Sequence, residues 1–156
     1  MNLFNHEGNG SMSNEIGDMQ HLMRINVGDK RLQSKGKLLL IGSCMDRFPE
    51  IVKDFSERDG GYAVLHVCLE ETHVNQIGFK IGSIVKYSGI SEVTALTVDG
   101  SPHCVQLHYV IDDVKRHFAP EIETKHFVVE KGKVHEISTD AVKKSRHLSK
   151  IQKMIS

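Results

Sequence analysis

The chain contains 156 residues, 39% of them hydrophobic and 26% charged, a composition typical of one globular domain with a sizeable core. Lys+Arg and Asp+Glu both number 20, so no net charge attracts nucleic acid or an anionic membrane. No apolar run is long enough to span a bilayer, and the beginning lacks the basic and apolar blocks of a secretory signal. Three cysteines cannot all pair with one another, so we expect a cytoplasmic protein with free or metal-bound thiols.

The beginning of the chain is rich in Gly, Asn and Ser around residues 8–11, as in a flexible leader. We assign residues 1–34 to this leader and residues 35–156 to a single folded domain. Residues 19–25 have some apolar character and could form a short helix packed on the domain.

Three apolar segments have the character of buried strands, at residues 38–41, 62–67 and 93–98. A helix is expected after each strand. The first helix begins at Pro49, and the third begins at Pro102.

The second helix is indicated by apolar positions at helical spacing in residues 77–85, and Gly89 is a suitable residue to end it. Residues 126–130 and 133–137 flank Lys131-Gly132 and are expected to form a hairpin. A last helix is expected to open at Thr139 or Asp140. We expect it to bury three apolar side chains, those of Leu148, Ile151 and Ile155.

Strands alternating with helices predict a three-layer α/β fold of the Rossmann-like kind, with a mostly parallel sheet, helices on both faces, and a C-terminal hairpin and helix. Right-handed crossovers favour an order in which the first strand lies between the second and the third.

All three cysteines follow predicted strands: Cys44 the first strand, Cys68 the second and Cys104 the third. The carboxyl ends of parallel strands meet at one edge of the sheet, where ligands bind. We therefore expect the three thiols to converge there.

Zinc takes four ligands, chiefly thiolate sulfur and imidazole nitrogen. Cys44, Cys68 and Cys104 with one histidine would make a closed site, whereas two cysteines and a histidine would leave a position for water. His103 is favoured because it adjoins Cys104. The alternative for Cys68 is a buried small hydrophobic residue. Other candidate imidazoles are His66, His73 and His108.

Six scattered histidines are interpreted as ordinary surface residues: His6, His21, His117, His126, His135 and His147.

Asp46 and Arg47 follow Cys44 in the same loop. As a catalytic pair they would orient a metal-bound water, which can attack an electrophilic carbon at neutral pH. The alternative is a capping Asp46 beside a solvent-facing Arg47.

The segment Gly42-Ser43-Cys44-Met45-Asp46-Arg47 resembles the first metal motif of β-class carbonic anhydrases, and residues 81–104 are similar to the region carrying the family's second cysteine. The resemblance implies a zinc-dependent lyase in which Cys44 and Cys104 are ligands and Asp46 is the acid of an Asp–Arg dyad. It also implies a homodimer.

Three positions depart from that family. Arg47 comes one residue early, Ser101 occupies the place of the family's histidine, and Val105 replaces a glycine. The residues therefore predict a metal-binding protein, with zinc activating water for a lyase or hydrolase acting on a small-molecule substrate.

Two further functions stay open. The cysteines could hold an iron–sulfur cluster, or two of them could form a reversible disulfide. A nucleotide or small-ligand module would use the backbone N–H groups near Gly42 and Gly100, although neither segment matches a phosphate-binding fingerprint.

Overall fold

The computed structural model describes residues 19–156, so the first part of the expected leader lies outside the described residues. Its sheet contains six strands in the order β1-β3-β2-β4-β5-β6. The strands are β1 (Gln20–His21), β2 (Lys37–Gly42), β3 (Ala63–Val67), β4 (Glu92–Val98), β5 (Glu123–Glu130) and β6 (Lys133–Ile137). All neighbouring strands are parallel except β5 and β6, which form the expected hairpin. The predicted fold class and the central position of β2 are confirmed.

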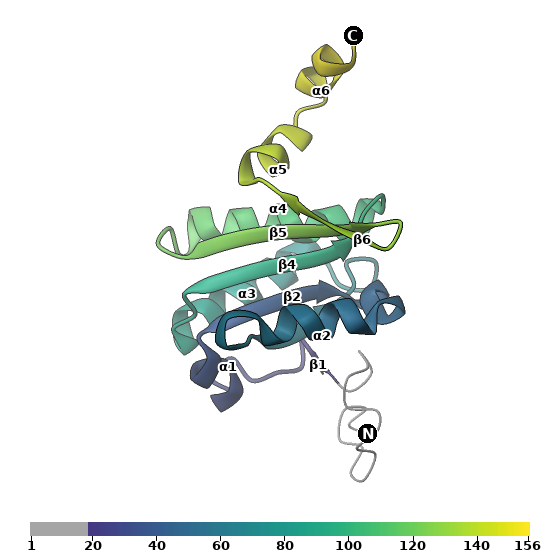
Figure 1. The fold of residues 1–156 in the computed structure, drawn as a ribbon. Coiled ribbons are helices and arrows are strands. Elements are labelled where there is room, and N and C mark those ends of the chain that lie inside the picture. The colour runs from purple at the N-terminus through teal and green to yellow at the C-terminus, as the bar shows by residue number, and fades with distance from the viewer. Residues whose placement is uncertain (1–18) are drawn as a thin grey trace.

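The α-helices are α1 (Lys30–Lys35), α2 (Pro49–Glu57), α3 (Val74–Ser88), α4 (Pro102–His117), α5 (Thr139–Ser145) and α6 (Leu148–Ile155). Two short 3-10 helices, η3 (Ser43–Arg47) and η4 (Arg58–Gly60), flank α2. Figure 1 shows α2 in front of the sheet and α3 and α4 behind it.

Two apolar cores therefore lie on opposite faces of the sheet. The larger joins β2, β3 and β4 to α3 and α4, through side chains such as Leu40, Ile81 and Ile111. The smaller joins α2 to the other face, through Leu39 and Phe55. Strand β2 has every residue from Leu38 to Gly42 buried, as its continuous apolar run predicts.

Helices α3 and α4 pack closely because α3 carries two glycines on the shared face. A Cβ at Gly82 would lie 2.5 Å from the Phe118 ring, and one at Gly78 would lie 2.9 Å from Val110. This close packing holds α4, and the cysteine in its first turn, firmly against the sheet.

The segment before residue 35 differs from the prediction. Residues 19–25 contain strand β1 and not the expected helix. The helix of this segment is α1, which comes later, at Lys30–Lys35. Asp29 caps α1 by accepting a hydrogen bond from the Arg31 backbone, and Gly36 ends it with a φ of 67°. Leu22 and Leu32 are fully buried, so this segment packs as part of the domain.

The C-terminal segment also differs. The expected single helix is divided into α5 and α6, with His147 as the N-cap of α6. The prediction that Leu148 and Ile155 are buried is wrong, because they are 80% and 75% exposed, and Ile151 is half-buried. Figure 1 shows α6 extending away from the sheet, beyond α5.

Candidate thiol site

The candidate site lies at the carboxyl ends of β2 and β4, the two central strands. Cys44 is in η3, directly after β2, and Cys104 is the third residue of α4, after β4. The crossover from β2 leads to β3 on one side, whereas β4 lies on the other side. The site thus occupies the switch point where open α/β sheets bind ligands.

The two sulfur atoms are in contact. Cys44 Sγ and Cys104 Sγ lie 3.3 Å apart, and both cysteines are free thiols. Gly42 forms the floor beneath them, since a Cβ at this position would lie 3.5 Å from each sulfur. The predicted convergence of Cys44 and Cys104 is therefore present in the fold.

The surroundings favour a thiolate on Cys104. A hydrogen bond from the Cys44 thiol, supported by Ser101 and the nearby His103, lowers the pKa of Cys104 to about 6. Ser101 is the expected N-cap of α4 and accepts a hydrogen bond from the Cys104 backbone N–H. The contact between the two sulfurs raises the pKa of Cys44, because the Cys44 proton is hydrogen-bonded to Cys104. One thiolate sharing one proton with a second thiol is the preferred state of the pair.

A pocket of about 100 Å³ opens beside the sulfurs. Its walls include further groups with ligand or acid–base chemistry, namely Ser43, Cys68, Glu70, Thr97 and His103. Apolar side chains complete it: Val67, Leu69 and Leu107. The four residues predicted as metal ligands therefore share one pocket.

Sharing a pocket does not make an assembled metal site. Within residues 19–156, no three His, Cys, Asp or Glu side chains are grouped closely enough to hold an ion. Zinc needs four ligands in tetrahedral geometry. Cys44 and Cys104 fit as two of them, but Cys68 or His103 would have to turn toward the pair to supply a third.

Asp46 and Arg47 lie apart from the pocket. Both are exposed, and neither lines its wall. Arg47 instead directs its guanidinium to the Cys44 carbonyl, with an Nε–O distance of 3.5 Å. Arg47 thus faces solvent as in the alternative, but Asp46 does not cap α2, whose N-cap is Phe48, and the proposed catalytic dyad gains no support.

The other candidate imidazoles have different surroundings. His73 is the exposed N-cap residue of α3. His66 hydrogen-bonds through Nδ1 to Ser43 Oγ, 3.0 Å away, and burial lowers its pKa to about 4. Ser43 thus presents to the pocket a hydroxyl that is backed by a neutral imidazole.

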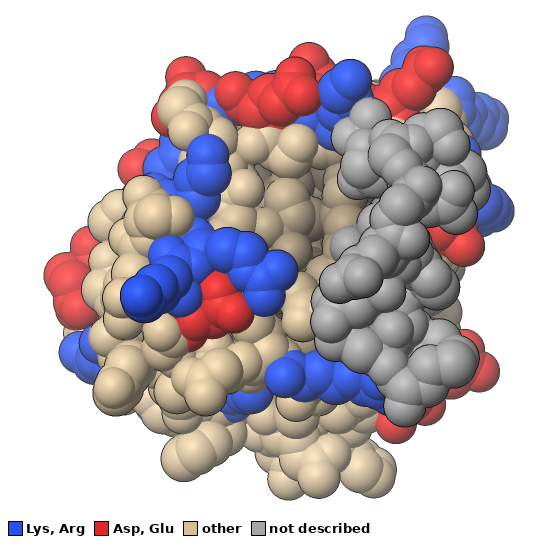
Figure 2. All heavy atoms as spheres, turned by 90° about the horizontal axis from the view of Figure 1, so that it is seen from below, with Lys and Arg blue, Asp and Glu red and all other residues tan. Residues whose placement is uncertain are grey.

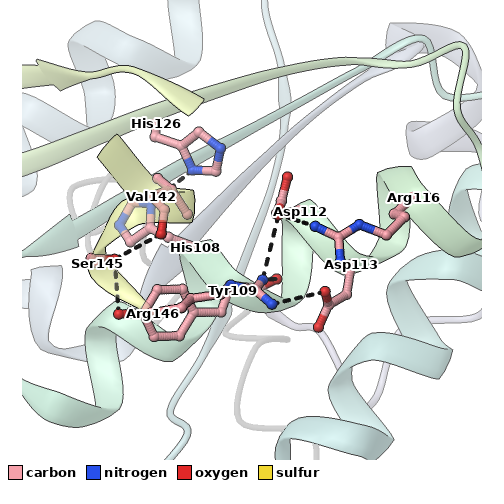
Figure 3. A network of polar contacts seen from close by, with 9 residues as sticks. All are labelled: His108, Tyr109, Asp112, Asp113, Arg116, His126, Val142, Ser145 and Arg146. Atoms are coloured by element: carbon pink, nitrogen blue, oxygen red, sulfur yellow. Dashed lines mark hydrogen bonds and ion pairs between the residues drawn. The ribbon is translucent and has the colours of Figure 1, made fainter. Parts of the chain in front are cut away.

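Thr97, another residue that lines the pocket, makes a second hydroxyl–imidazole contact. Thr97 Oγ1 is 2.8 Å from His108 Nε2, and His108 Nδ1 is 2.9 Å from His126 Nδ1. His126 was predicted to be a surface residue; this is wrong, because it is only 1% exposed. Figure 3 shows it beneath β5, facing His108 on α4. The signal in the sequence was its position two residues before Val128 in β5, because residues two apart in a strand share a face of the sheet.

Charges are mixed on the surface that Figure 2 displays, where Lys and Arg alternate with Asp and Glu around an uncharged hollow. This face shows no extended patch of one sign. Across residues 19–156, no helix combines the length and the apolar character needed to cross a bilayer.

Comparison with known proteins agrees with the architecture. No curated protein and no solved structure matches the chain. A family model described as a Rossmann-like domain matches residues 31–156, from α1 to the C-terminal helices, and nothing in that match points to carbonic anhydrases. The chain belongs to this Rossmann-like domain family.

Proposed function

We propose that the protein carries out thiol–disulfide exchange, with Cys44 and Cys104 cycling between a dithiol and a disulfide. The observation that carries the proposal is the 3.3 Å contact between two free sulfurs at the switch point of the sheet. A disulfide requires sulfurs about 2.05 Å apart, so a small movement joins them. The size of the pocket, about 100 Å³, favours a small-molecule disulfide as substrate.

The reaction proceeds in two displacements. The Cys104 thiolate attacks one sulfur of the substrate disulfide, forms a mixed disulfide and expels the first thiolate. Cys44 then loses its proton and attacks Cys104 Sγ, which closes the protein disulfide and expels the second thiolate. Two electrons pass from the protein thiols to the substrate, and the reverse sequence reduces the protein.

The test is a thiol count combined with disulfide mapping. The reduced protein is treated with a small disulfide, unfolded, alkylated and analysed by peptide mass spectrometry. We expect a Cys44–Cys104 link with Cys68 free, and no intramolecular link in Cys44→Ser or Cys104→Ser. Cys68→Ser is the matched control and should oxidise like the natural chain. A link through Cys68, or no intramolecular link, would overturn the proposal.

A zinc site is the second candidate, favoured by the presence of Cys68 and His103 in the same pocket. Cys44 and Cys104 would then be ligands, and zinc would supply a Lewis acid that activates water for a lyase or hydrolase. Elemental analysis of freshly purified protein tests this. Stoichiometric zinc that disappears in both Cys44→Ser and Cys104→Ser would support it, whereas equal zinc in these variants would reject it. Visible absorption after anaerobic purification would indicate an iron–sulfur cluster instead.

A reducing cytoplasm is the compartment that we propose for either function, because both need Cys44 and Cys104 as thiols. We also propose a homodimer, on the carbonic-anhydrase resemblance alone. Light scattering at several protein concentrations tests the assembly, and a constant monomer mass would reject the dimer.

A further inference from the structure

A chain of buried polar groups extends from the thiol pocket through the interior of the domain. It begins at Thr97, which lines the pocket and is 1% exposed. A Cβ at Gly42 would lie 3.8 Å from the Thr97 methyl carbon Cγ2 and 3.5 Å from each sulfur, so this methyl group and the thiols surround the same point, while the Thr97 hydroxyl contacts His108. From Thr97 the contacts continue to His108 and then to His126, at 2.8 Å and 2.9 Å.

The contact between the two rings limits their protonation. Two Nδ1 atoms face each other, so only one of them carries the hydrogen that joins them. Burial lowers the pKa of both histidines, that of His108 to about 3, and both rings are therefore neutral at pH 7. A proton accepted at one end of such a pair is released at the other end, and the shared hydrogen changes rings.

The far end of this row of buried polar groups, at His126, leads toward the surface. His126 Nε2 is buried and has no hydrogen-bond partner among the described residues. In Figure 3 this nitrogen points away from His108, on the side where Asp112 lies. The Asp112 carboxylate also acts electrostatically on His126, raising its pKa against the effect of burial.

Asp112 connects this interior to solvent. Its side chain is 4% exposed and contacts Arg116 and Arg146, at 3.3 Å and 3.5 Å. It also lines an open pocket of about 290 Å³ with Lys115 and Lys143. A proton reaching Asp112 can therefore pass to bulk water.

We propose that Thr97, His108 and His126 form a proton path from the thiol pocket to Asp112. The inference rests on the proposed thiol–disulfide exchange. The path removes the proton of Cys44 when this thiol attacks the mixed disulfide on Cys104. The proton leaves through Asp112, the electron pair forms the new S–S bond, and the substrate thiolate departs. Cys44 and Thr97 line the same pocket, whose volume of about 100 Å³ is large enough for the water that would complete the path between them.

Two other groups compete for this role. Glu70 lines the thiol pocket, and His66 contacts it through Ser43. Glu70 is exposed, so bulk water solvates its carboxylate. The experiment therefore compares variants of the three routes directly.

The experiment mixes reduced protein rapidly with a small aromatic disulfide whose thiolate is coloured. The first colour phase reports attack by Cys104, and the second reports closure by Cys44. His126→Gln keeps an amide that can form hydrogen bonds but cannot accept and pass on a proton. We expect it to slow the second phase by about 100-fold, which is the lower end of the range for general acid–base catalysis. The first phase and the final disulfide yield should stay unchanged.

Matched variants keep the test decisive. His135→Gln, at an exposed histidine of β6, is the control and should leave the second phase at its natural rate. Glu70→Gln and His66→Gln test the competing routes, and each is expected to slow the second phase less than His126→Gln does. Asp112→Asn, at the outer end of the proton path, should slow the second colour phase and lower the solvent deuterium isotope effect on that phase. A natural second phase in both His126→Gln and Asp112→Asn, or a slow one in Glu70→Gln alone, would overturn the path. Absence of closure in the natural chain would overturn the proposed function as well.

Discussion

Within residues 19–156, a hydrogen bond joins two pairs of like ionisable groups, and these pairs have opposite electrostatic characters. The sulfurs of Cys44 and Cys104 lie 3.3 Å apart beside an open pocket, and their surroundings stabilise one negative charge. The ring nitrogens of His108 and His126 lie 2.9 Å apart inside the domain, and their surroundings exclude charge.

The difference comes from the neighbours rather than from the distance. Cys104 accepts hydrogen bonds from the Cys44 thiol, the Ser101 hydroxyl and the Val98 backbone and has His103 nearby, all of which favour an anion. His108 has only Thr97 and another neutral ring as partners, and it is 3% exposed. Contact between like groups thus stabilises a reactive thiolate beside the pocket and a neutral hydrogen-bonded pair of imidazoles in the interior.

The largest predicted effect concerns the neutral pair. Below pH 6.5 His108 becomes protonated in the unfolded chain, whereas in the folded chain it stays neutral down to about pH 3. Stability is therefore present above pH 6.5 and is lost as the pH falls. At pH 4 the contribution of His108 to the loss is on the order of 3 kcal/mol relative to pH 7.

Urea unfolding of the natural chain, His108→Phe and His135→Gln between pH 4 and pH 7 measures this loss. His108→Phe is expected to be less stable at pH 7, because Thr97 and His126 lose a partner, but to lose less stability on acidification. His135→Gln should follow the natural chain. Equal acid slopes for all three proteins would show that His108 is not held neutral by the fold.

The next effect concerns the space around the sulfur pair. A Cβ at Gly42 would make ordinary contacts of 3.5 Å with both sulfurs, so Gly42→Ala should keep the pair together. The additional carbons of Gly42→Val must enter the space that the sulfurs occupy, at a cost of roughly 1–3 kcal/mol in unfolding free energy. We expect Gly42→Val, but not Gly42→Ala, to reduce Cys44–Cys104 disulfide formation as measured by thiol counting. The same yield in both variants would mean that the sulfurs do not depend on this floor.

The sequence was sufficient to predict the three central strands of the sheet and the meeting of the two sulfurs. The apolar runs that became β2, β3 and β4 are strong signals, and right-handed crossovers leave few orders for them. Because Cys44 and Cys104 directly follow neighbouring strands, the strand order determines their proximity.

Other features depend on contacts that periodicity does not encode. The stripe of Leu148 and Ile155 has helical spacing, but spacing does not say whether another element covers it. His126 meets His108 only because β5 is placed against α4, a contact between residues distant in the chain. Helix α1 has only Leu32 as a buried residue, so its signal was the pair of caps, Asp29 and Gly36.

The smallest predicted effect tests whether the sulfur pair holds its charge through its own hydrogen bond. The Cys44 thiol is the first cause of the lowered pKa of Cys104, about 6. Cys44→Ala removes this donor and should raise the Cys104 pKa by at least one unit, equivalent to about 1.4 kcal/mol. Cys44→Ser keeps an O–H donor in the same place and should leave the pKa closer to its natural value.

Ultraviolet absorption of the thiolate, followed as a function of pH, measures this midpoint, and Cys68→Ala controls for the third thiol. A midpoint that rises in Cys44→Ala and recovers in Cys44→Ser would attribute the charge to the hydrogen bond. A midpoint unchanged in both would attribute it to the first turn of α4 alone, and the sulfur pair would then differ from the imidazole pair by its helix terminus rather than by its contact.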